Sequence, residues 1–250
     1  MQSRLRLFTL ALALLVPLTG CSTPPRQPNQ INVLVFTRTQ GFRHDSIPAG
    51  VNAMRELCAE AGYVMQQSED PAVFNDASLE TIDVVTFLNT TGDILNDEQQ
   101  RAFEAWFRKG GGFLGIHSAA DTEYDWPFYT ELIGAHFTGH PPVQQAVIMR
   151  ERYNHPAVRF LPARWQRTDE WYNYNRLPHG RNTAVLLVLD TTSYRGSTMG
   201  GYHPIAWCKQ LRKGRMFYTG GGHTIESFSE PLFRKHLGAA LRWVAHDEND

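Results

Sequence analysis

The sequence predicts an α/β protein built around a mostly parallel central sheet. Short apolar runs at 31–37, 82–88 and 113–116 show little alternation with polar residues, which is typical of parallel strands buried on both faces. Segments with helical spacing of apolar residues lie between these runs. Because strands and helices alternate along the chain, we expect right-handed crossovers and a doubly wound sheet.

The first unit is predicted to be a strand followed by a helix and a second strand. The run at 31–37 is the first strand. A helix is expected over 48–61, and Gly62 stands where a C-terminal cap belongs. Residues 63–67 then supply a second strand.

The second unit carries a stronger helix signal. The third strand, at 82–88, precedes Asn96, which is a candidate N-cap because Gln99 lies three residues further on. Aromatic residues at helical spacing follow and end at a run of glycines. The fourth strand covers 113–116 and stops at His117.

The second half of the chain predicts strands with little helix between them. An amphipathic helix over 231–245 closes the chain, and no internal repeat is present, so one domain is expected over 31–250. The strands are expected at 143–149, 165–171, 184–189, 205–209 and 215–219.

The composition excludes several partners. The chain has 24 Lys and Arg against 25 Asp and Glu, a net charge of −1, which leaves no electrostatic footprint for nucleic acid. The glycine triplets at 110–112 and 220–222 are not followed by the Lys-Ser/Thr of a phosphate-binding loop, so no nucleotide partner is predicted. Cys58 and Cys208 lie in helix-like and strand-like patterns and are predicted to be free, buried thiols.

The N-terminus resembles a bacterial lipoprotein signal. Two arginines precede an apolar run at 7–16, and the letters LTGC follow at 18–21. The run is too short to span a bilayer. The resemblance implies a signal peptide over 1–20, a lipidated Cys21 and a proline-rich tether over 21–30. A plain secretory signal is the alternative. Both place the folded part outside the cytoplasm, and membrane contact is expected through the lipid anchor only.

Titratable residues follow the predicted strands. Ligands of open α/β sheets bind beyond the carboxyl ends of the strands. His44 follows the first strand, His117 the fourth and His223 the last, while Asp169 and Glu170 end another. Imidazoles and carboxylates at one sheet edge are competent general acids and bases. These five residues are therefore the predicted catalytic groups.

Several separated motifs carry a family resemblance. They are GFRH at 41–44, GGGFLGIHS at 110–118, His136 with Phe137, HP at 140–141, DEWY at 169–172, and the segment from GR at 214–215 to GH at 222–223. Together they resemble the ThuA-like (trehalose utilisation) family over about residues 32–245. The resemblance implies a flavodoxin-like, three-layer fold similar to that of class I glutamine amidotransferases. It also implies a role in carbohydrate metabolism, in particular on 3-keto-glucosides and disaccharides.

One departure from the amidotransferases excludes their chemistry. Those enzymes place a cysteine nucleophile at the strand-to-helix turn, where this chain has His117. Ser118 is a poor nucleophile candidate because position 120 is Ala120, which breaks the Gly-x-Ser-x-Gly pattern. No glutaminase activity is expected.

A small-molecule sugar or glycoside is the expected partner. The residues expected to bind it are Arg43, Ser118, His136, His140, Trp171 and Tyr172. The cofactor stays open. A divalent metal is one option because histidine and carboxylate are competent ligands, although their spacing matches no compact metal signature. The candidate ligands are His44, His117, His136 and Glu170.

Three alternatives remain at this stage. The chain can be an acid-base or metal-assisted enzyme acting on keto-sugars, which clustered titratable groups favour, or a non-catalytic lipoprotein that binds a carbohydrate or a partner. The third is a structural or scaffolding lipoprotein, for which no organised polar cleft is expected. The histidines expected to be structural are His155, His179, His236 and His246, whereas His203 is left undecided.

Overall fold

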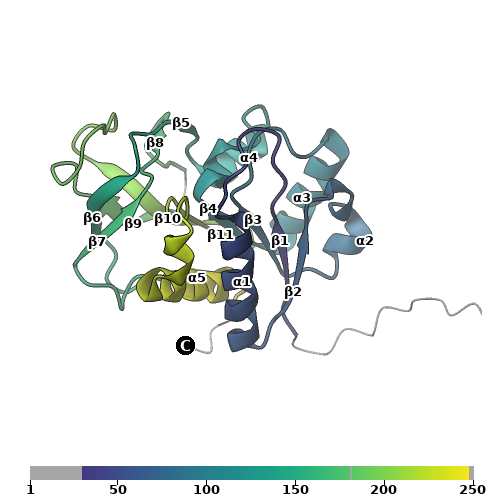
Figure 1. Cartoon of the computed structure of the whole chain (residues 1–250). Helices are drawn as coiled ribbons and strands as arrows, with labels where there is room; N and C mark the ends of the chain where they lie inside the picture. Colours follow the sequence, from purple (N-terminus) through teal and green to yellow (C-terminus); the bar gives the residue numbers. More distant parts are fainter. Residues whose placement is uncertain (1–29, 181, 248–250) are drawn as a thin grey trace, which may run out of the picture.

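The computed structural model describes residues 30–180 and 182–247, which form an α/β domain (Figure 1). The expected signal peptide and Cys21 lie outside these residues, as does most of the tether. The strands of the main sheet are β1 (Asn32–Phe36), β2 (Val64–Ser68), β3 (Val84–Leu88), β4 (Gly112–Ile116), β6 (Gln144–Arg150), β7 (Arg164–Asp169), β9 (Thr183–Leu189), β10 (His203–Leu211) and β11 (Gly214–Thr219). A small separate sheet pairs β5 (Phe137–Gly139) with β8 (Asn173–Tyr174).

The described helices connect and cover these strands. The α-helices are α1 (Ile47–Ala61), α2 (Asp76–Leu79), α3 (Asp97–Lys109), α4 (Pro127–Ile133) and α5 (Pro231–Val244). Short 3-10 helices occur at η1 (Pro71–Val73), η2 (His117–Asp121) and η3 (Glu226–Ser229). The sequence predicted α1, α3 and α5 but gave no signal strong enough for the short α2 and α4.

The main sheet has a parallel half and an antiparallel half. Within the described residues its order is β2-β1-β3-β4-β11-β10-β9-β6-β7. The strands from β2 to β11 pair in parallel, whereas β10, β9, β6 and β7 each pair antiparallel with their neighbours. The α/β class is confirmed. The sheet is mixed rather than parallel in its second half because β10 and β11 form a tight hairpin and no helix intervenes among β10, β9 and β6.

Helices cover both faces of the parallel half, which gives three layers (Figure 1). Phe87 on β3 contacts the rings of Phe103 in α3 and Tyr129 in α4. The next residue, Leu88, faces α1, where a Cβ on Gly50 would lie 3.0 Å from its side chain. Because successive strand residues point to opposite faces, α3 and α4 cover one face and α1, with α5 beside it, covers the other.

The antiparallel half curls back toward the parallel half. In a flat sheet, four strand spacings of about 4.8 Å would put β7 about 19 Å from β11. The Asp169 side chain at the end of β7 nevertheless accepts hydrogen bonds from the backbone N–H groups of Gly222 and His223, which follow β11. The natural twist of the sheet is therefore large enough to bring both strand ends to one place.

Two buried donors from β10 fix the end of α4. The Trp207 indole N–H donates to the Ile133 carbonyl, and the Lys209 ammonium donates to the Glu131 carbonyl. Both carbonyls belong to the last turn of a helix, where no intrahelical donor is available. These contacts anchor the chain just before His136.

Two further expectations are settled by the described residues. Cys58 and Cys208 are free and buried, as predicted. No helix in the described part of the chain is long and apolar enough to cross a membrane.

Candidate active site

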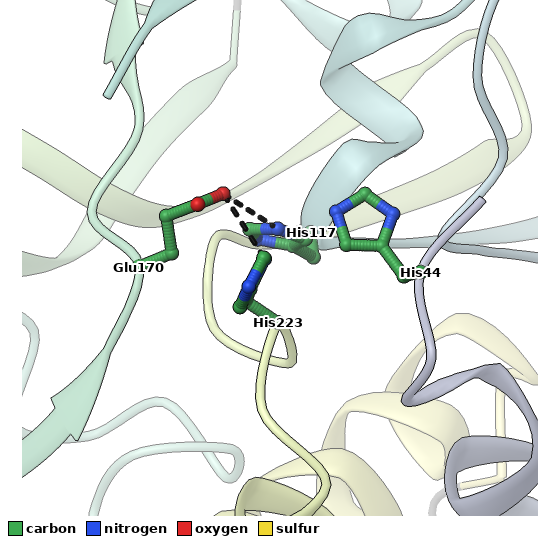
Figure 2. A group of neighbouring side chains, drawn as sticks. All are labelled: His44, His117, Glu170 and His223. Atoms are coloured by element: carbon green, nitrogen blue, oxygen red, sulfur yellow. Dashed lines mark ion pairs between the residues drawn. The ribbon is translucent and has the colours of Figure 1, made fainter. Parts of the chain in front are cut away.

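Four predicted site residues meet at the carboxyl edge of the sheet (Figure 2). His44 lies in the loop after β1, His117 directly follows β4, Glu170 directly follows β7, and His223 lies in the loop after β11. Each side chain offers one potential ligand atom, and these atoms all lie within 4.8 Å of one another. We call these four residues the His/Glu cluster.

His117 is held in a strained backbone conformation. Its φ is 50°, in the left-handed region that non-glycine residues seldom adopt. The Tyr218 hydroxyl donates to the His117 carbonyl at 2.9 Å, and His117 Nδ1 lies 2.9 Å from the Gly220 carbonyl oxygen. The imidazole also packs against the Tyr172 ring, with centroids 4.1 Å apart. These contacts hold the strained turn and aim the imidazole at Glu170.

Glu170 is the acidic centre of the His/Glu cluster. Its Oε2 lies 3.5 Å from His117 Nε2 and 3.1 Å from His223 Nδ1, while its Oε1 lies 2.9 Å from His140 Nδ1. Burial alone would raise the pKa of this carboxyl, but the neighbouring His117 and His223 outweigh it and hold the pKa at about 2. Glu170 is therefore ionised at neutral pH. In turn, its carboxylate raises the pKa of His223.

His44 closes the other side of the His/Glu cluster. Its ring meets those of His117 and His223 edge-on, with centroids 4.9 and 5.1 Å away. Burial, together with the two neighbouring imidazoles, lowers the pKa of His44 to about 3, so this ring is neutral at physiological pH. Ser118 Oγ lies 3.4 Å from His44 Nδ1 and can hold the ring's orientation. The exposed Phe42 ring covers His44 at a centroid distance of 4.9 Å.

The His/Glu cluster is accessible from one side. The His117 side chain is 0% exposed, whereas that of His223 is 25% exposed and that of His140 is 41% exposed. A substrate therefore approaches past His223 and His140, and His117 lies at the closed end.

Asp169 fastens the backbone that carries two of the cluster residues. Its carboxylate accepts from the backbone N–H groups of Glu170, Gly222 and His223 at 2.9, 2.8 and 3.1 Å. It also accepts from Ser227 Oγ at 2.9 Å and pairs with Arg167 at 3.1 Å. This fully buried carboxylate is surrounded by hydrogen-bond donors, so it holds the neighbouring backbone segments together and does not act as an open base. We call this arrangement the Asp169 clamp.

The glycine triplet at 220–222 makes room for this clamp. A Cβ on Gly221 would lie 2.3 Å from Arg167 Nη1, and Gly222 has a φ of 115°. The sequence excluded a phosphate-binding role for these glycines. Close packing accounts for Gly221, against Arg167, and for Gly220, where a Cβ would lie 2.6 Å from Ile205 and from the Tyr174 hydroxyl, whereas the backbone conformation accounts for Gly222.

Three residues expected in the site lie elsewhere. Arg43 pairs with Glu69 at 2.7 Å on the surface. His136 is outside the His/Glu cluster because its Nε2 lies 2.9 Å from Thr130 Oγ1 and its ring stacks on Tyr124. Trp171 is 0% exposed, which removes its ring from contact with a ligand. Its indole N–H donates to a backbone carbonyl of the neighbouring strand.

His140 and Tyr172 do border the His/Glu cluster. His140 contacts Glu170 as described above. The Tyr172 ring lies between the rings of His117 and Phe137, 4.1 Å from each. Tyr172 is nearly fully buried, so it supports the His117 ring instead of offering a free face.

Sequence reasoning missed Asn89. This fully buried residue follows β3, and its amide donates to Ser46 Oγ at 2.9 Å and to the Gly222 carbonyl at 3.0 Å. It thereby joins the start of α1 to the loop that carries His223. The signal was available, since an abrupt polar run at 89–91 follows an apolar strand at the same sheet edge as His117.

Three further histidines outside the site have structural partners. His179 Nδ1 lies 3.0 Å from the Gly134 carbonyl oxygen, and His236 Nδ1 lies 2.8 Å from that of Ala157. His203 Nε2 lies 2.8 Å from the Tyr172 carbonyl oxygen, so this ring braces the segment after Glu170.

Fold and site together define a flavodoxin-like α/β protein with a histidine and glutamate centre at the carboxyl edge of its sheet. The chain belongs to the ThuA family, described as trehalose utilisation, which matches residues 32–244. Membership supports a role in carbohydrate metabolism related to trehalose utilisation. A search among curated proteins finds no match.

Solved structures share the fold. A ThuA-like protein from Bacteroides uniformis has a TM-score of 0.73 and 23% identity, over 89% of this chain and 95% of that chain. One from Parabacteroides merdae has a TM-score of 0.70 and 18% identity, over 86% and 90%. A β-galactosidase from Bacillus circulans has a TM-score of 0.56 and 13% identity, over 85% of this chain but 31% of its own. At these identities the likeness concerns the fold alone.

Proposed function

We propose that this chain is an enzyme that transforms a sugar or glycoside derivative, in particular a 3-keto-glucoside or 3-keto-disaccharide, at the His/Glu cluster. The observation that carries the proposal is the convergence of three imidazoles and one carboxylate from four separate segments on a buried strained turn. A site that only holds a ligand has no need of so many titratable groups at one point.

The charges of these groups suit proton transfer beside a carbonyl. His44, whose ring is neutral, or His117 takes the proton from the carbon next to the keto group. The electron pair left on that carbon forms a double bond as the bond to the glycosidic oxygen breaks. His223, whose pKa is raised by Glu170, gives a proton to the departing oxygen. Addition of water across the double bond then yields the free keto-sugar.

Glu170 has a separate part in this scheme. Its carboxylate stays ionised and contacts His117, His223 and His140, so it orients these rings and stabilises positive charge on them. A carboxylate with a pKa of about 2 is itself a weak base. We therefore assign it the positioning of the imidazoles and not the proton abstraction.

A product assay on 3-keto-glucosides tests the proposal. The wild type is expected to release the keto-sugar, and His117→Ala is expected to lower kcat by at least about 100-fold, the contribution of a positioned acid or base. His179→Ala is the matched control because this exposed histidine lies outside the site. Binding of the sugar without any turnover would refute the enzyme and favour a binding module.

We also propose that the protein works outside the cytoplasm and is attached to a bacterial membrane through Cys21. The support is the lipoprotein-like sequence at 18–21. Labelled fatty acid is expected to enter the wild type and not Cys21→Ser. Equal labelling of both, or of neither, would refute the anchor.

A further inference from the structure

Two ring nitrogens of the His/Glu cluster face a carboxylate oxygen without making a hydrogen bond. His117 Nδ1 lies against the Gly220 carbonyl, which only accepts hydrogen bonds, so the hydrogen of the neutral ring is on Nδ1. His117 Nε2 then carries a lone pair, and it is aimed at a carboxylate oxygen of Glu170 at 3.5 Å. This buried nitrogen has no hydrogen-bond partner, and neither does His223 Nδ1, which faces the same oxygen.

In the neutral form of His117, a lone pair at Nε2 that faces a carboxylate oxygen in a buried place is unfavourable. An unsatisfied buried polar atom costs about 1–3 kcal/mol. One cation among these atoms would satisfy both ring nitrogens and the carboxylate at once. We propose that His44, His117, Glu170 and His223 bind one divalent transition-metal ion. The chemical use of this ion rests on the function proposed above, but its binding can be measured by itself.

The spacing of the donor atoms is compatible with one ion. Four atoms bound tetrahedrally at about 2.1 Å lie about 3.4 Å from one another. The present atoms all lie within 4.8 Å of one another, so they need to close by roughly 1.5 Å at most. We expect rotations of the four side chains to supply this closure.

The surroundings also resemble those of metal-binding histidines. Such histidines usually donate their other ring N–H to a carbonyl or carboxylate, which fixes the ring and raises its basicity, as the Gly220 carbonyl does for His117. His140 contacts the second oxygen of Glu170 and orients the carboxylate in the same way. The side that is open past His223 leaves access for a substrate oxygen or for water.

The donor set selects the class of metal. Three imidazoles and one carboxylate suit zinc, iron, cobalt, nickel or manganese, whereas magnesium and calcium prefer sites made of oxygen ligands. Bound there, such an ion would polarise the keto oxygen of a sugar and make the hydrogen on the neighbouring carbon more acidic. The ring nitrogens that hold the ion would then act as ligands, so the proton transfers proposed above apply to these rings in the metal-free site.

Titration of the purified, chelator-treated full-length chain with Zn²⁺, Co²⁺ and Mg²⁺ tests this inference. One transition-metal ion per chain is expected by calorimetry and elemental analysis, with a visible absorption spectrum of bound Co²⁺ and no comparable affinity for Mg²⁺. His117→Ala and Glu170→Gln are each expected to raise the Kd for Zn²⁺ by at least about 100-fold. His223→Asn, at a partly exposed position, guards against a folding defect in the buried variants.

His136→Ala is the discriminating control, because the sequence placed His136 among the ligands and the structure does not. It is expected to keep the wild-type Kd. The inference is overturned if no transition metal binds stoichiometrically, if Mg²⁺ binds equally well, or if the three cluster variants bind like the wild type. Keto-sugar turnover that survives the chelator would leave the proposed enzyme standing and remove the metal.

Discussion

Removal of the Asp169 carboxylate tests whether this residue holds the site together or acts in the chemistry. In Asp169→Ala, the N–H groups of Glu170, Gly222 and His223 lose their acceptor. Arg167, whose side chain is 3% exposed, keeps only Glu230 as a charged partner. The loop with His223 and the segment with Glu170 then lose the link that the Asp169 carboxylate provides between them.

The expected loss of stability is large. Removing one partner of a buried ion pair costs about 3–5 kcal/mol. For a domain of this size, 1 kcal/mol corresponds to about 2–4 °C in Tm, so a fall of roughly 6–20 °C is expected. Glu104→Ala provides a control, since it breaks a surface pair with Arg108 worth about 0.3–0.5 kcal/mol.

Thermal unfolding followed by circular dichroism measures the difference in Tm between the variants. Titration with Zn²⁺ measures the Kd for the ion in the same samples. We expect Asp169→Ala to lower Tm and to weaken ion binding, and Asp169→Asn, which keeps the shape and one acceptor oxygen, to fall between it and the wild type. An Asp169→Ala protein with an unchanged Tm would refute the clamp. If that protein were also inactive, Asp169 would act directly on the substrate.

Three further changes have defined outcomes. Gly221→Ala drives a Cβ to 2.3 Å from Arg167 Nη1 and should lower Tm by several degrees, whereas Gly201→Ala, with nothing within 4 Å, should leave it unchanged in the same scan. Asn89→Leu removes the link to the Gly222 carbonyl and should raise the KM for the keto-sugar, and it should also lower Tm because the φ of 51° at this position strains a leucine; an unchanged KM would contradict the link. Burial lowers the pKa of Lys209 to about 8, so between pH 8 and 10 the unfolded chain, with a lysine pKa of about 10.4, binds more protons. The free energy of unfolding by urea should therefore rise with pH in that range in the wild type relative to Lys209→Met; parallel curves would contradict this sign.

The parallel half of the fold was predictable because its signals are local. Unbroken apolar runs and the Asn96 cap, which forms a complete capping box with Gln99, depend on neighbouring residues alone. The direction of the later strands was not predictable, since pairing in an antiparallel sheet depends on contacts between distant segments. The helix α4 was not predicted because it is short and because its last turn depends on hydrogen bonds from Trp207 and Lys209 of β10.

The candidate site was predictable as a set of positions and not as a set of contacts. Placement at strand ends correctly indicated that His44, His117, Glu170 and His223 come together. It could not separate His136 from them, because a turn after α4 directs this ring toward Tyr124. Whether a side chain faces the site depends on torsion angles and packing that a single sequence does not display.

The curl of the antiparallel half has a consequence for folding. Successive residues of the His/Glu cluster lie 73, 53 and 53 positions apart along the chain, so their contacts are of high sequence separation and form slowly. An intermediate that contains only the parallel half lacks Glu170, because β7 is the edge strand at the other end of the sheet. The site can therefore exist only after β7 has joined the sheet, and binding there would report that both halves of the sheet have formed.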